Sequence, residues 1–330
     1  MGKFVSPQEM ASLLAGHAGR LVLVAHMRPD GDAAGSALGL CAALKAVGQN
    51  AVCAGIEPLA PEYDYLEGLA EVIPALEYAP LPEDAMVVMD CGALSRIAEP
   101  LRAHAAKNAV FCVDHHKDYS DFAEYAFIKE GASSAAEMVM EVVEAGGLPL
   151  TRGVAEALWT GIATDTGRFS YASTTAETLR RAARLVDAGA RFAWINERIF
   201  GRMELKRIML RRRLLDSLEV APSGKSVVGS LGPEDYAAEK CDASDSDSFI
   251  DIVRSVSGTD IAVFLRKTLP EGSVKISMRT TERFDAAAIC KAEWGGGGHA
   301  RAAGAELSGD IREVRAAVFA RVQAIADAGA

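Results

Sequence analysis

The sequence predicts an α/β protein with a parallel-sheet N-terminal domain and a smaller α/β C-terminal domain. In the first half, three apolar runs each lead into an aspartate or a histidine, and helical patterns separate the runs. Such runs are typical of buried parallel strands joined by helical crossovers. The chain has 330 residues, more than a single hydrophobic core usually supports. We therefore expect two domains, with ligands gathered at the carboxyl ends of the parallel strands.

The first elements follow from hydrophobic periodicity and from the breakers between periodic segments. Residues 7–18 have the pattern of an amphipathic helix, and the apolar run Leu21–Ala25 predicts a strand that ends at His26. The Ala- and Leu-rich stretch 33–47 predicts a helix with small residues for close packing on a sheet. A short strand is expected over 51–54.

Two further strands and three helices complete the predicted N-terminal domain. Residues 85–90 and 109–114 are apolar runs ending in aspartate, and the second continues into His115 and His116. Helices are expected over residues 133–145, 154–163 and 174–188, the last opened by a capping box at 174–177.

The second half predicts a smaller domain with one unusual loop. A long helix over 191–220 is expected to connect the domains, which gives boundaries of 1–190, 191–222 and 223–330. Strands are expected over 226–231, 260–266 and 273–279, and helices over 246–257, 284–293 and 311–328. The acidic, serine-rich segment 242–248 predicts an exposed loop, and the glycine-rich stretch 295–304 a loop before the last strand.

Composition excludes several classes of protein. The formal net charge of −10 argues against holding long nucleic acid mainly by phosphate neutralisation, although a small basic pocket is compatible with it. The six cysteines form no CxxC pair and several lie in apolar runs, which predicts reduced core residues. Neither a run of roughly 20 apolar residues nor a signal-peptide pattern is present, so we expect a cytoplasmic protein without membrane contact.

The chemistry is predicted to centre on the stretch Val24–Ala33. Here His26, Asp30 and Asp32 follow a strand, and Pro29 and Gly31 keep the loop out of helical geometry. Further candidate ligands at the ends of later elements are Asp90, Asp114, His115, His116 and Asp165. A carboxylate-rich set with imidazoles suits Mn²⁺ or Mg²⁺, and its mutual repulsion implies more than one ion. For Asp114 the sequence leaves open a structural role or the orientation of a ligating histidine.

Together these residues resemble the four motifs of the DHH phosphoesterase superfamily. The motifs are His26-x3-Asp30-x-Asp32, Asp90, Asp114-His115-His116 and Asp165-Thr-Gly-Arg-Phe169. The stretch Gly295–Gly304 resembles the glycine-rich motif of the companion DHHA1 domain. The likeness spans nearly the whole chain and is strongest to the stand-alone nano-RNases (oligoribonucleases) and pAp phosphatases.

The resemblance implies a role for each motif residue. His26, Asp30 and Asp90 would hold one metal ion, and Asp32, the bridging Asp90, His115 and Asp165 the other. The catalytic set would be Asp90, Asp114 and His116, with His116 contacting the scissile phosphate or protonating the leaving oxygen. The ions would be two Mn²⁺, with Mg²⁺ and Co²⁺ as alternatives, and the active site would lie in the cleft between the domains.

The glycine-rich stretch predicts a phosphate-binding element. Successive glycines let backbone N–H groups form an anion nest, and charged side chains near it can complete a phosphate clamp. The candidate substrate-binding residues are Gly296, Gly297, Gly298, His299, Arg301, Arg279 and, in the motif of Asp165, Arg168.

The function implied is hydrolysis of short single-stranded RNA to mononucleotides and removal of the 3′-phosphate of adenosine 3′,5′-bisphosphate (pAp). Alternative substrates are cyclic di-AMP and the linear dinucleotides pApA and pGpG, because the same site would serve them. A RecJ-like single-strand exonuclease and a non-catalytic nucleotide-binding module are the remaining alternatives. The family also implies a homodimer.

Overall fold

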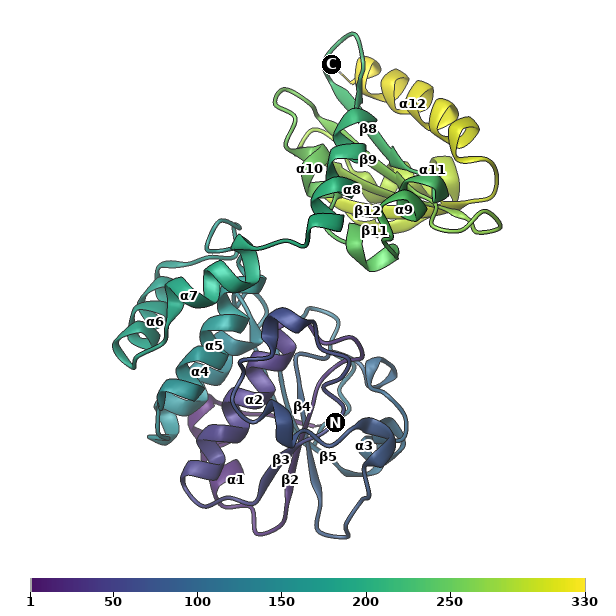
Figure 1. Ribbon diagram of the computed structural model, residues 1–330. Coiled ribbons are helices and arrows are strands. Elements are labelled where there is room, and N and C mark those ends of the chain that lie inside the picture. The colour runs from purple at the N-terminus through teal and green to yellow at the C-terminus, as the bar shows by residue number, and fades with distance from the viewer. Residues whose placement is uncertain (1, 330) are drawn as a thin grey trace. The chain divides into compact units, whose positions relative to one another are not determined.

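A computed structural model describes residues 2–329, apart from the side chains of residues 109 and 110. The chain forms two compact units that divide between Arg202 and Met203 (Figure 1). The predicted continuous helix over 191–220 is wrong. The segment contains α7 (Phe192–Asn196), a π-helical turn (Glu197–Gly201) and α8 (Leu205–Asp216), separated by residues 202–204. A break at this point agrees with the poor helix propensity of Gly201.

The predicted parallel sheet of the N-terminal unit is present, with strand order β1-β6-β5-β4-β2-β3. All of its neighbouring strands pair in parallel. The strands are β1 (Lys3–Phe4), β2 (Leu21–Val24), β3 (Ala51–Cys53), β4 (Ala85–Met89), β5 (Ala109–Asp114) and β6 (Tyr125–Ile128). The sequence analysis did not predict β1 or β6.

Helices cover both faces of this sheet. The helices of this unit are α1 (Pro7–Ala15), α2 (Gly31–Ala46), α3 (Leu101–Asn108), α4 (Ala135–Gly146), α5 (Arg152–Asp165) and α6 (Ala176–Asp187), and α6 packs on α4 and α5. Single 3₁₀ turns lie at Pro61–Tyr63, Leu69–Glu71, Ala75–Glu77 and Leu94–Arg96. The capping box of α6 begins at Thr175 and closes with Thr178, one residue later than predicted. The helix α3 was also missed by the sequence analysis.

Two apolar cores lie on the opposite faces of the sheet, because successive strand residues point to opposite sides. Leu21 and Leu23 of β2 pack in the core that contains α1, α2, α4 and α5. Val22 and Val24 pack in the other core, which also contains Leu101 of α3. Every residue of β2 is therefore buried, which explains its continuous apolar run.

The C-terminal unit has a mixed sheet of order β11-β12-β10-β9-β8-β7, in which only β8 and β9 pair in parallel. Its strands are β7 (Glu219–Val220), β8 (Ser226–Leu231), β9 (Ile261–Arg266), β10 (Val274–Thr280), β11 (Gly297–His299) and β12 (Ala302–Leu307). Its further helices are α9 (Pro233–Glu239), α10 (Ile250–Arg254), α11 (Ala286–Trp294) and α12 (Ile311–Ala328), with a 3₁₀ turn at Ala243–Ser246. Figure 1 shows α12 along this sheet.

Three predictions for this unit are corrected by the structure. The glycine-rich stretch is not a loop, because β11 within it forms a hairpin with β12. The segment 242–248 contains a 3₁₀ turn in which Asp245 and Ser246 are buried. The predicted helix 246–257 is limited to the short α10.

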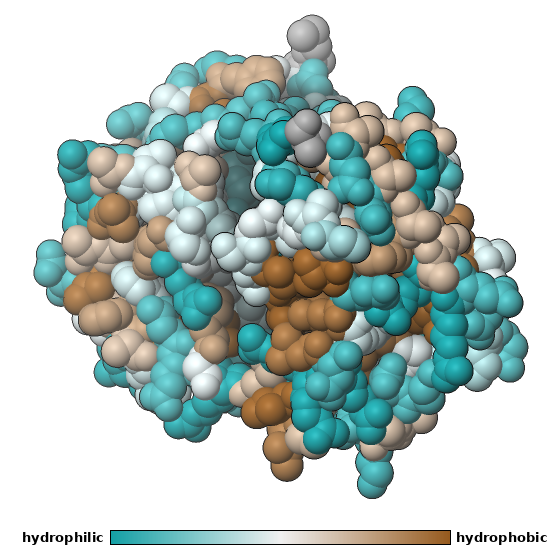
Figure 2. Space-filling model, turned by 90° about the horizontal axis from the view of Figure 1, so that it is seen from above, coloured by the Kyte–Doolittle hydropathy of each residue, from teal (hydrophilic) through white to brown (hydrophobic). Residues whose placement is uncertain are grey.

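The polar surface and the free cysteines are those expected from the amino-acid composition. Figure 2 shows one face of the molecule, where hydrophilic residues surround smaller areas of hydrophobic ones. Within residues 2–329, none of the helices has the length and apolar character needed to cross a membrane. All six cysteines are free thiols, and all but Cys241 are buried, as predicted.

Candidate active site

The predicted ligands of the N-terminal unit converge at one edge of the sheet. The strands β5, β4 and β2 are neighbours, so their carboxyl ends lie side by side. His26 lies two residues after β2, Asp90 directly follows β4, and Asp114 is the last residue of β5. The side chains of His26, Asp90 and Asp114 are all buried.

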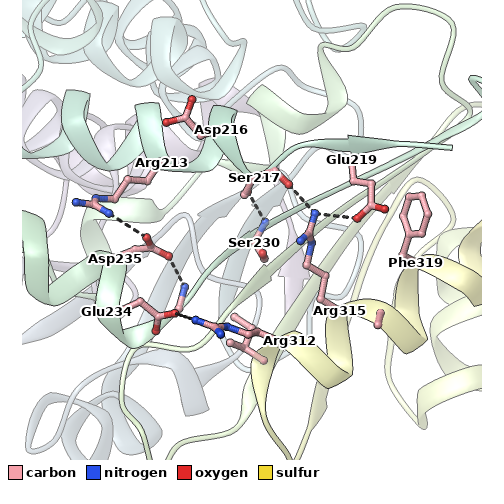
Figure 3. Close-up of a pocket in the computed structure, with 13 residues that line it drawn as sticks. Arg213, Asp216, Ser217, Glu219, Ser230, Glu234, Asp235, Arg312, Arg315 and Phe319 are labelled. Atoms are coloured by element: carbon pink, nitrogen blue, oxygen red, sulfur yellow. Dashed lines mark hydrogen bonds and ion pairs between the residues drawn. The ribbon is translucent and has the colours of Figure 1, made fainter.

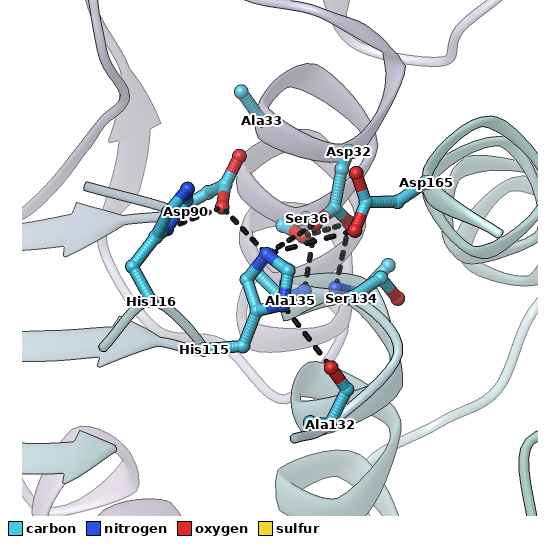
Figure 4. A network of polar contacts seen from close by, with 12 residues as sticks. Asp32, Ala33, Ser36, Asp90, His115, His116, Ala132, Ser134, Ala135 and Asp165 are labelled. Atoms are coloured by element: carbon cyan, nitrogen blue, oxygen red, sulfur yellow. Dashed lines mark hydrogen bonds and ion pairs between the residues drawn. The ribbon is translucent and has the colours of Figure 1, made fainter. Parts of the chain in front are cut away.

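Two histidines present their Nε2 atoms to this site. His26 Nδ1 lies 3.0 Å from the carbonyl of Met27, and His115 Nδ1 lies 3.1 Å from the carbonyl of Ala132. A carbonyl only accepts hydrogen bonds, so Nδ1 carries the proton in both rings and Nε2 can act as a ligand. His115 Nε2 lies 3.4 Å from Asp90 Oδ1, as Figure 4 illustrates, and His26 Nε2 lies 3.6 Å from Asp90 Oδ2.

Asp32 is held by the N-terminus of a different helix. Its Oδ2 accepts a 2.7 Å hydrogen bond from the amide of Ala135, and its Oδ1 a 2.8 Å bond from the amide of Ala136. These amides belong to the first turn of α4, where the helix dipole favours a negative charge. Gly161 lies close by, since a Cβ there would be 2.7 Å from Asp32 Oδ1. The backbone of α4 and the glycine of α5 therefore fix the carboxylate.

The remaining acidic groups come from the ends of two helices. Asp30 is the N-cap of α2, and its Oδ1 accepts hydrogen bonds of 3.0 Å from the amides of Asp32 and Ala33. Asp165 is the last residue of α5, and its Oδ2 lies 3.6 Å from His115 Nε2. Because Oδ1 of Asp30 caps the helix, its Oδ2 remains for a metal ion.

The structure groups these residues into sets that fit divalent cations. Potential ligand atoms lie within 4.8 Å of one another in three sets: His26, Asp30 and Asp90; Asp32, His115 and Asp165; and Asp90, His115 and His116. Among the described residues, Asp90 Oδ1 is buried without a hydrogen-bond partner. Asp90 also has a φ of +50°, uncommon for a non-glycine residue and a form of strain found at functional sites.

The protonation behaviour of the cluster supports cation binding. Burial and the nearby Asp90 and Asp165 raise the pKa of Asp32 well above its ordinary value. Burial also raises the pKa of Asp165 to about 6. Burial alone would lower the pKa of His115, but Asp90 and the other carboxylates raise it to about 10. Crowded carboxylates thus retain protons, and divalent cations can take the place of those protons.

His116 lies beside the cluster and is oriented by Asp114. Its Nδ1 lies 2.7 Å from Asp114 Oδ1, and the hydrogen bond to this fully buried carboxylate raises the pKa of His116. The Asp114 contact therefore favours a protonated His116 with Nε2–H available to a substrate. The sequence left two roles open for Asp114, a structural one or the orientation of a ligating histidine. The contact supports orientation of a histidine, and that histidine is His116.

Arg168 follows the cluster in a strained turn. Gly167, Arg168 and Phe169 have consecutive positive φ values of 54°, 60° and 64°. The hydroxyl of Thr166 accepts a 3.0 Å hydrogen bond from the Phe169 amide and stabilises this turn. The guanidinium of Arg168 lies 5.2 Å from the ring centroid of Phe200. Arg168 is therefore close to Asp165 in the sequence, but its guanidinium group stacks on the ring of Phe200.

The substrate residues predicted in the C-terminal unit gather at the β11–β12 hairpin. Ala302 of β12 is in register with both Arg279 of β10 and His299 of β11. Directly paired residues share a face of a sheet, so Arg279 and His299 emerge on the same face, about 10 Å apart by strand spacing. This pair can hold a phosphate group between two basic side chains.

Steric contacts explain why glycine is needed at two positions of this hairpin, and Arg301 has a structural role in it. A Cβ at Gly296 would lie 2.1 Å from the carbonyl oxygen of Gly304, and Gly298 has a φ of +143°. A Cβ at Gly297 meets nothing within 4 Å. Arg301 donates to the carbonyls of Thr281, Glu282 and Phe284. Its guanidinium therefore holds the turn after β10 against the hairpin.

A separate cavity of about 600 Å³ in the C-terminal unit contains none of the predicted site residues. Figure 3 shows its arginines bonded to neighbouring acidic residues. Arg213 contacts Asp235, Arg312 contacts Glu234, and Arg315 contacts Glu219. Because acidic residues already neutralise its arginines, this cavity should bind an anion less strongly than the β11–β12 hairpin.

Two family models match the chain. The model of the DHH family N-terminal domain matches residues 20–162, and the model of the DHHA1 domain matches residues 227–324. The chain is 33% identical over 305 residues to the bifunctional oligoribonuclease and PAP phosphatase NrnA of Thermus thermophilus, covering 91% of this chain and 88% of the relative. It is 25% identical to the NrnA protein of Bacillus subtilis, covering 87% and 89% of the two chains.

Solved structures share the fold of this chain. An exopolyphosphatase-related protein from Bacteroides fragilis is similar with a TM-score of 0.85 and 25% identity, over 96% of this chain and 95% of that one. The RecJ protein of Thermus thermophilus in complex with Mn²⁺ shares the fold, with a TM-score of 0.50 and 17% identity over 97% of this chain and 54% of RecJ. The two matching domains and the chain-wide similarity to NrnA place this chain in the DHH family of phosphoesterases with a C-terminal DHHA1 domain.

Proposed function

We propose that this protein hydrolyses short oligoribonucleotides to mononucleotides and removes the 3′-phosphate of pAp, using two divalent metal ions. The observation that carries the proposal is the convergence of His26, His115 and carboxylates from two helices on Asp90. The two activities in the names of the NrnA relatives support the same substrates for this chain.

The site suits two ions. Asp30, Asp32, Asp90 and Asp165 supply four negative charges when ionised, which two divalent cations would balance. His26, Asp30 and Asp90 would hold one ion, and Asp32, Asp90, His115 and Asp165 the other, with Mn²⁺ expected. When bound, such ions activate water and stabilise negative charge developing at phosphorus.

Each remaining residue has a task that follows from its contacts. Asp90 would face both ions, because one of its oxygens lies near His26 and the other near His115. His116, oriented by Asp114, would donate a proton to the scissile phosphate or the leaving oxygen. Arg279 and His299 of the C-terminal unit would hold the terminal phosphate of the substrate. A clamp that requires a terminal phosphate would favour short substrates.

The test measures product release from 5′-phosphorylated RNAs, from dinucleotides to long oligomers, with pAp and cyclic di-AMP alongside. We expect Mn²⁺-dependent cleavage of the shortest RNAs and of pAp, with long RNA spared. Inertness toward both the dinucleotide and pAp would overturn the proposal. Selective cleavage of cyclic di-AMP or pApA would assign the same site to the turnover of nucleotide messengers.

A further inference from the structure

A second group of reactive side chains lies in the N-terminal unit, at the end of α2 remote from its metal ligands. Cys41 of α2 and Cys53 of β3 are both buried, and both line a pocket of about 330 Å³. The same pocket is lined by Lys45 of α2 and by Glu67 and Glu71 of the loop and 3₁₀ turn that follow β3. The two thiols are therefore shielded by protein but reached from a cavity large enough for a small molecule.

The backbone brings the two cysteines together. Cys53 Sγ lies 3.6 Å from the carbonyl oxygen of Ala37. In an α-helix, that carbonyl accepts the amide hydrogen of the residue four positions later, which is Cys41. The sulfur of Cys53 thus lies against the turn of α2 that carries Cys41, and both thiols line the same pocket.

The surroundings of Cys41 favour its thiolate. The neighbouring Cys53 thiol lowers the pKa of Cys41 in spite of burial, and the Lys45 ammonium lowers it further. Lys45 follows Cys41 by four residues and so lies on the same face of α2. Glu71 opposes this effect, because its carboxylate lies 2.7 Å from the Lys45 ammonium. A thiolate beside a cation, next to a second thiol, is the usual environment of a reactive cysteine.

We propose that Cys41 and Cys53 form a redox-active thiol pair that reacts with hydroperoxides. The Cys41 sulfur attacks the distal peroxide oxygen, the O–O bond breaks, and the departing oxygen takes a proton to leave as water or an alcohol. Cys41 is then a sulfenic acid. The Cys53 sulfur attacks the Cys41 sulfur, forming a disulfide and releasing the hydroxyl with the thiol proton as water. Two thiols lose two electrons, and the hydroperoxide gains them.

The experiment treats the folded, full-length protein with hydrogen peroxide, blocks free thiols and maps peptides without reduction. We expect a linked pair of peptides containing Cys41 and Cys53, two hydrogens lighter than their sum and separated by dithiothreitol. Absence of this link from oxidised, folded protein would overturn the proposal. This experiment needs no variant, and its outcome does not depend on whether the protein has phosphoesterase activity.

Variants test the assigned roles. In Cys53→Ser, dimedone should trap a sulfenic acid at Cys41 at least about tenfold faster than at Cys290, because the thiolate fraction changes tenfold per pKa unit. Cys290 is the internal control, since it is buried and burial raises its pKa to about 11. Lys45→Gln should slow the reaction of Cys41, and Glu71→Gln should accelerate it. Equal labelling of Cys41 and Cys290 would contradict the assignment.

Discussion

The buried carboxylate of Asp114 lies 2.7 Å from Nδ1 of His116 and fixes the orientation of that imidazole. Nδ1 of His116 also lies 3.6 Å from Asp90 Oδ1, so the same ring is adjacent to the proposed metal centre. His116 is half-exposed, whereas Asp114 is inaccessible to solvent. We therefore propose that Asp114 is a positioning residue that acts on a substrate only through His116.

Replacing Asp114 with asparagine keeps a hydrogen-bond acceptor of similar size but removes its charge. We expect kcat on pAp to fall by about 10–100-fold, the usual effect of losing the carboxylate partner of a functional histidine. The bound metal, measured by elemental analysis, should remain at the wild-type level, because Asp114 is outside the proposed ligand sets. An unchanged kcat would exclude the positioning role.

Replacing Asp90 with asparagine should abolish both activities together with metal binding. Asp90 belongs to two of the ligand sets, so its loss weakens both proposed ions. We expect kcat/KM to fall by at least about 10³-fold, because the ions supply most of the charge stabilisation at phosphorus. Elemental analysis and dinucleotide hydrolysis measure the two effects. Asp118→Asn is the matched control, because Asp118 is exposed, and a similar loss in that variant would contradict the assignment.

The ligand positions were predictable because they follow from local rules. Asp90 and His115 directly follow apolar strands, and the edge of a parallel sheet brings such positions together. The amides of Ala135 and Ala136 that hold Asp32 were not predictable. Any residue except proline supplies a backbone N–H, so alanine carries no signal that its amide binds a carboxylate.

The missed elements depend on tertiary pairing. Glycine is disfavoured in strands, so the sequence of β11 argues against a strand. It pairs with β12 because missing side chains allow the close approach of Gly296 to Gly304. The four-residue strand β6 is stabilised by pairing with both β5 and β1, which no short pattern reveals. The register of β6 is decided by these long-range contacts.

The ion pair of Glu137 and Arg181 is expected to stabilise the N-terminal unit. The two groups lie 2.6 Å apart and are almost completely buried, and Glu137 also accepts hydrogen bonds from Ser133 and Thr178. Glu137→Gln should lower the free energy of unfolding by about 3 kcal/mol, because the buried Arg181 loses its closest carboxylate and keeps only its longer contacts with Glu141 and Glu177. The control Glu197→Gln removes an exposed carboxylate that pairs with the exposed Arg202, and it should cost less than about 1 kcal/mol. Urea denaturation measures both.

The contribution of Glu137 should depend on pH. Burial alone raises its pKa, but hydrogen bonds from Ser133 and Thr178 and the charge of Arg181 lower it below the ordinary value. The folded state therefore binds this proton less readily than the unfolded state. The stabilisation is fully present above the unfolded pKa of about 4.3 and is lost as the pH falls through the folded pKa. In metal-free protein, the stability difference between wild type and Glu137→Gln should shrink below that pH.

Alanine substitutions at Gly297 and Gly298 test the β11–β12 hairpin as a substrate-binding element. Gly298 has a φ of +143°, and a Cβ there would lie 2.6 Å from the Ala302 carbonyl oxygen and the Ala303 Cα, whereas a Cβ at Gly297 meets nothing. Gly298→Ala should therefore distort the hairpin, at a cost of about 1–3 kcal/mol in stability. Its KM for pAp should rise several-fold while its metal content stays unchanged, and Gly297→Ala should match wild type. A normal KM in Gly298→Ala would exclude the hairpin from substrate binding, because the metal centre alone would then account for affinity.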